Sequence, residues 1–252
     1  MTGTAQLFDV SSRRKKIGHI TPSSNTMLEP LTGVMNLPLA NALSHHFTRI
    51  VVKQLTLGSA TSSQFTTANF LTAADLLNDC EADAIVWNGT SGSWLGVEND
   101  EEFCRRVTER TGRLASTSTL AFHEVFRRFG FKRIALAVPY VSDLTAQIAT
   151  VYGMHGFDVV AEAHLGLTIN LEIGRTSGDA IRRLLRDARS ARADCIAVVC
   201  TNLAATPFVE EMEKELGMPI IDSIAVTYWQ ACRLVGVEPA IEGWGALLRG
   251  SL

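Results

Sequence analysis

The chain has 252 residues, of which 46% are hydrophobic and 19% are charged, and its formal net charge is −3. This composition provides enough apolar side chains for a packed core and excludes a disordered chain. A slightly negative charge excludes the basic footprint of a nucleic-acid-binding protein. No apolar run approaches the roughly 20 residues of a membrane-spanning helix. We therefore expect one large or two small globular domains, with no nucleic-acid or membrane partner.

Short β-rich runs alternate with longer helical stretches along the whole chain. The predicted strands are 16–21, 46–52, 84–87, 133–138, 158–161, 195–199 and 219–222. The predicted helices are 63–80, 100–111, 119–129, 142–155, 177–191, 206–216 and 226–234. Alternation of this kind is typical of parallel sheets with helices on both faces. The predicted fold class is therefore α/β.

Two pairs of segments repeat within the chain. Residues 82–90 and 193–201 each contain Ala-Asp, then a short apolar run, then a polar turn. Residues 17–23 and 134–140 are each an apolar strand that ends in Pro and a hydroxyl-bearing residue. The repeats predict two pseudo-symmetric, Rossmann-like halves, each a parallel sheet flanked by helices, with the active site in the cleft between them.

The repeats also predict where the halves divide. We assign residues 15–120 to the first half and residues 121–222 to the second. We expect residues 223–252 to pack back on the first half.

Polar segments follow four of the predicted strands, at 22–25, 88–93, 139–142 and 200–202. In open α/β sheets, ligands bind outside the carboxyl ends of the strands, so these segments should converge on one cleft. Their neutral hydrogen-bonding residues are Ser23, Ser24, Asn25, Thr90, Ser91, Ser93, Tyr140, Ser142, Thr201 and Asn202. Such groups beside helix N-termini suit a carboxylate or an enolate. The same residue types also favour helix caps and turns, which is the alternative for any one of them.

The cysteines provide the second chemical signal. The chain has five, Cys80, Cys104, Cys195, Cys200 and Cys232. Their odd number, the lack of CxxC spacing and an N-terminus without an apolar signal core predict free thiols in a reducing, cytoplasmic compartment. The histidines lack metal-ligand spacing and no glycine-rich phosphate loop is present, so we predict neither a metal nor a cofactor.

Cys200 differs from the other cysteines in its position. A cysteine in an apolar run is by default a small buried hydrophobe, which is our interpretation of Cys195. Cys200 ends its strand, where its sulfur can face the cleft and helix N–H groups can tune its pKa. Both a packing role and a catalytic role remain open for it. When the repeats are superposed, Cys200 falls on Gly89, so any thiol chemistry would be one-sided.

These residues resemble the aspartate/glutamate racemase superfamily, in its branch of maleate cis-trans isomerases and arylmalonate decarboxylases, over nearly the whole chain. Pro-Ser-Ser-Asn at 22–25 resembles the isomerase turn, whose Asn binds a substrate carboxylate. Gly-Thr-Ser at 89–91 resembles the decarboxylase dioxyanion hole, which a tyrosine at the place of Tyr140 completes. Cys200 matches the cysteine that protonates the carbanion. The resemblance implies two α/β halves, a site between them and no cofactor.

Two departures from the family patterns bear on the reaction. Isomerases and racemases of the superfamily resemble one another in having a cysteine in each half, whereas Gly89 resembles the decarboxylases. The turn at 22–25 is isomerase-like, and Phe65 stands near a position where the decarboxylases have Tyr. The chain is thus a hybrid of the two patterns, and its substrate is expected to be more polar than an arylmalonate.

We therefore predict cofactor-independent decarboxylation of an α-substituted malonate or a related dicarboxylate, through an enediolate that Cys200 protonates. The predicted substrate-binding residues are Gly89, Thr90, Ser91, Tyr140, Asn25, Ser24, Thr201 and Asn202. One alternative is a maleate isomerase or an Asp/Glu-type racemase with a substituted first-half cysteine, which a Gly89→Cys variant should strengthen. Another is a non-catalytic carboxylate-binding protein. The expected partner is a small-molecule dicarboxylate, and homo-oligomer formation is left open.

Overall fold

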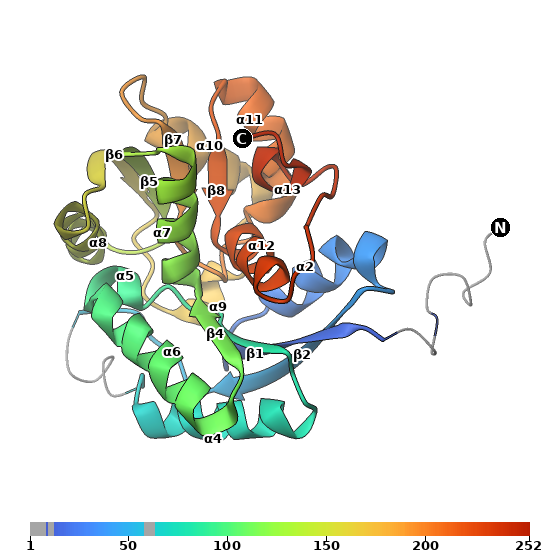
Figure 1. Ribbon diagram of the computed structural model, residues 1–252. Coiled ribbons are helices and arrows are strands. Elements are labelled where there is room, and N and C mark those ends of the chain that lie inside the picture. Colours follow the sequence, from blue (N-terminus) through green and yellow to red (C-terminus); the bar gives the residue numbers. More distant parts are fainter. Residues whose placement is uncertain (1–8, 10–12, 58–63) are drawn as a thin grey trace.

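The computed structural model describes residues 9, 13–57 and 64–252 (Figure 1). Its strands form two four-stranded sheets in which every pairing is parallel. The first sheet, in the order β2-β1-β3-β4, contains β1 (Lys15–Pro22), β2 (Leu43–Ile50), β3 (Ala84–Trp87) and β4 (Leu114–Thr117). The second, in the order β6-β5-β7-β8, contains β5 (Arg133–Val138), β6 (Asp158–His164), β7 (Cys195–Val198) and β8 (Ile220–Asp222). The matching strand orders confirm the predicted fold class.

Helices cover both sheets. They are α2 (Leu28–Met35), α4 (Thr67–Asp79), α5 (Gly92–Leu95), α6 (Val97–Thr111), α7 (Ser118–Phe129), α8 (Ser142–Met154), α9 (Asn170–Ile173), α10 (Gly178–Ala188), α11 (Val209–Leu216), α12 (Ser223–Leu234) and α13 (Ala246–Arg249), with 3-10 turns η1 (Leu37–Leu39) and η2 (Thr206–Phe208). In Figure 1, α4 and α6 lie below the first sheet, whereas α2 and α12 lie above it. Within the described ranges, no helix has the length and apolar character needed to cross a membrane.

Helix α12 contacts α2, β3 and β4 of the first half, and also α7, β8 and α13. The first sheet ends at Thr117 and the second begins at Arg133. The exact domain boundaries, at residues 120 and 222, stay predictions.

The sequence pattern missed strand β4, helix α2, the short helices α5, α9 and α13, and the 3-10 turn η1. Strand β4 was not predicted, because its sequence Leu-Ala-Ser-Thr is short and half polar, although Ser116 and Thr117 are buried. Helix α2 contains Pro30 and Gly33, two residue types that disfavour helix interiors, so its sequence gives a weak helical pattern. Pro30 lies in the first turn, where a proline removes no intrahelical hydrogen bond.

Several boundaries also moved. Strand β2 begins at Leu43, earlier than predicted, and ends at Ile50. Helix α12 begins at Ser223 because the buried Asp222 carboxylate caps it, accepting from the N–H groups of Ile224 and Ala225 at 3.0 and 3.1 Å. The predicted helix 63–80 starts at a residue that lies outside the described part, and α4 itself begins at Thr67.

The repeated Ala-Asp pair has the same structural role in both halves. Asp83 accepts a hydrogen bond from the Lys16 N–H at 2.8 Å, and its own N–H donates to the Lys16 carbonyl at 2.7 Å. Asp194 accepts from the Arg133 N–H at 2.8 Å and donates to the Arg133 carbonyl at 2.7 Å. Each aspartate therefore joins the start of the third strand of its half to the start of the first strand, which fixes the register of the sheet centre.

We expect Asp194→Ala to lower the free energy of unfolding at pH 7 by about 1.5–3 kcal/mol, because backbone N–H groups lose a charged acceptor. The Arg133 guanidinium lowers the pKa of Asp194 from 3.8 to about 2. Because the pKa of Asp194 is lower in the folded state than in the unfolded state, its contribution to the free energy of unfolding is present above pH 4 and is lost as the pH falls toward 2. Urea unfolding between pH 7 and pH 3 should therefore show that the difference in free energy of unfolding between the wild-type protein and Asp194→Ala shrinks as the pH falls. The matched control is Asp187→Ala, at an exposed position of α10, and a pH-independent loss at Asp194 would contradict the interpretation.

Candidate active site

A cavity lies at the carboxyl ends of the strands, with walls from both halves. Its lining residues are Pro22, Val52, Leu55, Phe65, Trp87, Gly89, Thr90, Ser91, Trp94, Tyr140, Asn170, Cys200 and Thr201. Six predicted site residues are among them, namely Gly89, Thr90, Ser91, Tyr140, Cys200 and Thr201. They come together because β1, β3, β5 and β7 are central strands that point the same way within their sheets.

Thr90 and Tyr140 meet across the boundary between the halves. The Thr90 Oγ1 and Tyr140 Oη atoms are 3.2 Å apart, and both side chains are buried. Burial raises the pKa of Tyr140 well above its usual value. The phenol therefore stays protonated at neutral pH and can donate a hydrogen bond.

The Cys200 thiol lies beside this pair. Its side chain is buried, with a residue exposure of 3%. Burial raises the pKa of Cys200, although hydrogen bonds from the Tyr140 hydroxyl and from the N–H groups of Asn202 and Leu203 act in the opposite direction. The net shift keeps the group a neutral thiol at pH 7, which is the form that can give up a proton.

Ser91 is oriented by the Trp87 indole. The Trp87 Nε1 donates to Ser91 Oγ at 3.2 Å. An indole N–H can only donate, so Ser91 Oγ is the acceptor in this bond and its own proton is available to an acceptor in the cavity. Ser91, Thr90 and Tyr140 thus place three neutral hydroxyl groups around the cavity.

Asn25 joins the two halves but is not part of the cavity lining. Its side-chain N–H group donates to the Thr201 carbonyl at 3.0 Å and to Thr201 Oγ1 at 3.2 Å. Its side-chain oxygen accepts from the N–H groups of Met27 and Leu28, each at 3.0 Å, at the start of α2. The amide is therefore both a bridge between the halves and a helix cap.

Ser24 and Asn202 also act beside the cavity rather than in its lining. Asn202 accepts from the Thr26 N–H at 2.9 Å and donates to the Asn170 carbonyl at 2.6 Å. Asn170 donates to Ser24 Oγ at 2.9 Å, and Ser24 donates to the Val52 carbonyl at 2.5 Å. These bonds hold the loops that form the walls. Substrate contacts by Ser24, Asn25 and Asn202 stay predictions.

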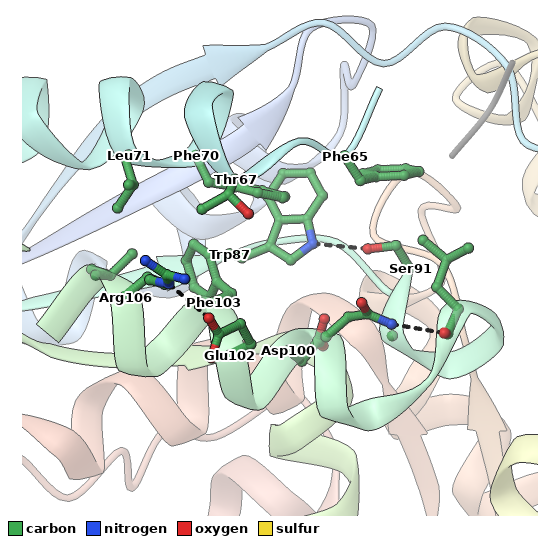
Figure 2. Close-up of a pocket in the computed structure, with 14 residues that line it drawn as sticks. Phe65, Thr67, Phe70, Leu71, Trp87, Ser91, Asp100, Glu102, Phe103 and Arg106 are labelled. Atoms are coloured by element: carbon green, nitrogen blue, oxygen red, sulfur yellow. Dashed lines mark hydrogen bonds and ion pairs between the residues drawn. The ribbon is translucent and has the colours of Figure 1, made fainter. Parts of the chain in front are cut away.

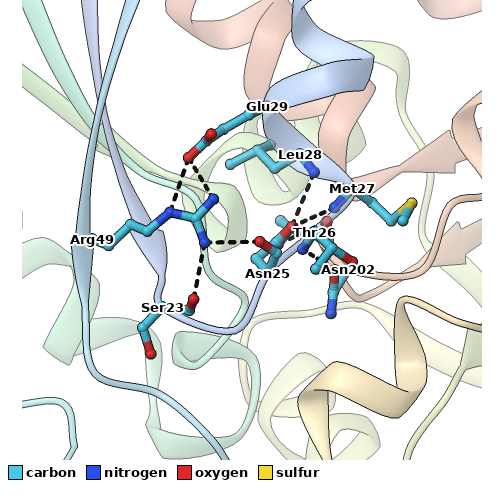
Figure 3. A network of polar contacts seen from close by, with 9 residues as sticks. Ser23, Asn25, Thr26, Met27, Leu28, Glu29, Arg49 and Asn202 are labelled. Atoms are coloured by element: carbon cyan, nitrogen blue, oxygen red, sulfur yellow. Dashed lines mark hydrogen bonds and ion pairs between the residues drawn. The ribbon is translucent and has the colours of Figure 1, made fainter.

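Arg49, which was not predicted from the sequence, stabilises the turn at 22–25 (Figure 3). Its Nη1 donates to the carbonyls of Ser23 and Asn25, each at 2.9 Å. The rest of the guanidinium forms an ion pair with Glu29, at 2.7 Å from Nη2. Within the sequence, Arg49 is one polar residue in a predicted strand, and nothing in that pattern distinguishes it.

Other lining residues were missed for a related reason. Trp87 and Trp94 lie in apolar surroundings and read as core residues, and Asn170 follows β6 without a motif. Asn170 enters the cavity because segments distant in sequence pair there, in an antiparallel bridge between Gln54 and Ile169. Phe65, singled out from the sequence, does line the cavity.

Comparison with known proteins identifies the family. A family model described as arylmalonate decarboxylase matches residues 38–248. The chain belongs to the arylmalonate decarboxylase family. The match includes Gly89, Tyr140 and Cys200 and confirms the resemblance inferred from the sequence.

The relatives of this arylmalonate decarboxylase family member are named after two different activities, maleate isomerase and arylmalonate decarboxylase. A maleate isomerase from Pseudomonas putida is 25% identical over 247 residues, which cover 94% of this chain and 98% of that protein. An arylmalonate decarboxylase from Bordetella bronchiseptica is 25% identical over 233 residues, 90% of this chain and 96% of that protein. The structure of the maleate cis-trans isomerase of Nocardia farcinica has the same fold, with a TM-score of 0.85 at 22% identity, and the match covers 94% and 98% of the two chains. These relatives are enzymes, and they share the fold rather than one reaction.

We expect Asn25→Ala to lower the free energy of unfolding by roughly 2–4 kcal/mol, because it removes the acceptor of the N–H groups at the start of α2 and leaves the buried Thr201 carbonyl without its donor. Urea unfolding measures the loss. The control is Asn69→Ala, at an exposed position near the start of α4, which should change stability by no more than ~0.5 kcal/mol. Equal effects of the two substitutions would show that the bridge between the halves contributes nothing.

Proposed function

We propose that the protein is a cofactor-independent decarboxylase of an α-substituted malonate or a related dicarboxylate. The observation that carries the proposal is the buried thiol of Cys200, the one cysteine among the described residues that line the cavity, beside the hydroxyl groups of Thr90 and Tyr140, with Gly89 at the equivalent position of the first half. One proton donor on one side of the cavity suits a reaction that protonates a carbanion once.

Neutral donors would bind the carboxylate that remains on the product. None of the described residues that line the cavity carries a charge. Thr90, Ser91 and Tyr140 instead offer hydroxyl groups, which can follow negative charge as it spreads over the two oxygens of an enediolate. Losing one preorganised donor of this kind typically raises the barrier by ~2.7–4 kcal/mol.

Another part of the cavity lining is apolar and would receive the carboxylate that leaves. Val52, Leu55, Phe65 and Trp94 provide poor solvation for a charged group but suit neutral CO2. When the bond between the α-carbon and this carboxylate breaks, its electron pair stays on the α-carbon and forms the enediolate. The Cys200 S–H then gives its proton to that carbon, and the thiolate regains a proton from water.

A maleate isomerase or racemase activity is the second candidate. The maleate isomerase relative and the Pro-Ser-Ser-Asn turn at 22–25 support it. Against it, the position equivalent to Cys200 holds Gly89, which has no nucleophile. Conversion of maleate to fumarate would favour this candidate over decarboxylation.

The direct test uses substituted malonates and maleate in D2O, followed by proton NMR. We expect a singly deuterated monoacid from the wild-type protein and a loss of roughly 10²–10⁴-fold in rate for Cys200→Ala. Cys195→Ala, at the buried first residue of β7 and outside the cavity lining, is the matched control and should retain turnover. Undiminished decarboxylation by Cys200→Ala would exclude the mechanism, and diacid binding without turnover would indicate a binding protein.

The pH profile gives an independent check. Since burial raises the pKa of Cys200, the protonated donor should persist past the ordinary thiol value of about 8.5. We expect kcat to be level from pH 7 to about 8.5 and to fall only at higher pH. A decline that begins below pH 8 would mean that another group, or a thiolate, controls the reaction.

A further inference from the structure

The Trp87 indole occupies the space that a side chain at position 89 would need. A Cβ placed on Gly89 would lie 2.1 Å from Trp87 Cζ2, 2.2 Å from Cε2 and 2.6 Å from Nε1. The backbone of Gly89 is not in the left-handed region, so its conformation does not demand glycine. The close approach of the indole is therefore what excludes a side chain there.

The indole is held firmly in this place (Figure 2). Trp87 is only 1% exposed, and its ring packs edge-on against Phe70 at a centroid distance of 4.9 Å and against Phe65 at 6.2 Å. Its N–H is fixed by the bond to Ser91 Oγ at 3.2 Å. Moving the ring away from Gly89 would break this bond and the aromatic packing together.

The ring is also a wall between two cavities. Trp87, Phe65 and Ser91 line both the site cavity and a second cavity between α4 and α6. Figure 2 shows this second cavity, with Phe70 and Phe103 beside the indole. A smaller side chain at position 87 would therefore connect the site cavity with the second cavity.

We propose that Trp87 is a specificity-determining residue that keeps the site one-sided, because its indole denies the first half any side chain at the position equivalent to Cys200. The inference deepens the proposed function and rests on it for its chemical consequence. The steric part stands on the structure alone. A Gly89→Cys variant should therefore gain isomerase or racemase activity only if the Trp87 indole also moves or is removed, because the new side chain needs the space that the indole occupies.

A double-mutant cycle on thermal stability tests the steric part without any assay of activity. Gly89→Ala should lower Tm by roughly 4–8 °C, because an added methyl group overpacks a closed site. In a Trp87→Leu background, which lacks the clashing ring atoms, the same Gly89→Ala change should leave Tm nearly unchanged. Equal losses in the two backgrounds would overturn the proposal. If Trp87→Leu alone does not fold, a crystal structure of Gly89→Ala decides the point, since an unmoved indole would also overturn it.

A racemisation assay tests the chemical consequence. Enantiopure α-substituted monoacid, the product of the proposed reaction, is incubated in D2O with Gly89→Cys and with Trp87→Leu/Gly89→Cys. Racemisation needs one thiolate to take the α-proton, with the C–H electron pair moving into an enediolate, and one thiol on the other face to return a proton to the carbon. We expect the double variant to racemise at least ten-fold faster than Gly89→Cys. Equal rates would overturn the proposal.

The outcomes separate the two proposals. If the wild-type protein decarboxylates no malonate, the proposed function fails, and the stability cycle still decides whether Trp87 excludes a side chain at position 89. If decarboxylation is found but the cycle shows no coupling between positions 87 and 89, the inference about Trp87 fails alone.

Discussion

The hydrogen bonds between Asn25 and Thr201 are the contact on which the rest of the site depends. Thr201 accepts from Asn25 and itself donates to the Asn88 carbonyl at 3.0 Å. The ends of β1, β3 and β7 are thereby joined across the boundary between two separate sheets. Because the cavity takes one wall from each half, this junction helps to fix the shape of the cavity. Misplacement of reacting groups by about 1 Å can cost two orders of magnitude in rate, so the alignment of the halves is itself part of the chemistry.

Burial keeps both titratable groups of the cavity, the Cys200 thiol and the Tyr140 phenol, protonated and neutral. Both Cys200 and Tyr140 are neutral because their surroundings disfavour a charged form. The same dry surroundings strengthen the hydrogen bonds that neutral donors can make to a developing anion. In the proposed reaction, a site of this kind would need no cationic side chain to stabilise an enediolate, and the hydroxyl groups of Thr90 and Ser91 would serve instead.

The sequence predicted the architecture well because the repeat has a physical basis. Asp83 and Asp194 make equivalent bonds in the two halves, so their recurrence marked equivalent strands. Gly89, Tyr140 and Cys200 could be assigned to the cavity because the carboxyl ends of adjacent parallel strands meet at one edge.

What the sequence could not predict depends on contacts between distant segments. Arg49 and Asn170 act through partners that only the folded chain brings near them, and neither lies in a distinctive motif. Trp87 was read as a strand residue, which is correct, but its relation to Gly89 depends on a side-chain orientation that no periodicity encodes. Strand β4 was missed because its burial comes from the helices around it rather than from apolar residues of its own.

The aspartates that fix the sheets and the residues that line the cavity lie at opposite ends of the strands. From Asp194 to Val198, the last residue of β7, the chain advances four residues, which corresponds to roughly 13 Å in an extended strand. Substitutions separated by more than about 7–10 Å usually have additive effects on stability. The cavity residues of each half can therefore diverge without disturbing the register of the sheet that carries them. Such modularity would allow one scaffold to hold a thiol in one half and a bare glycine in the other, and new activities to be selected at low structural cost.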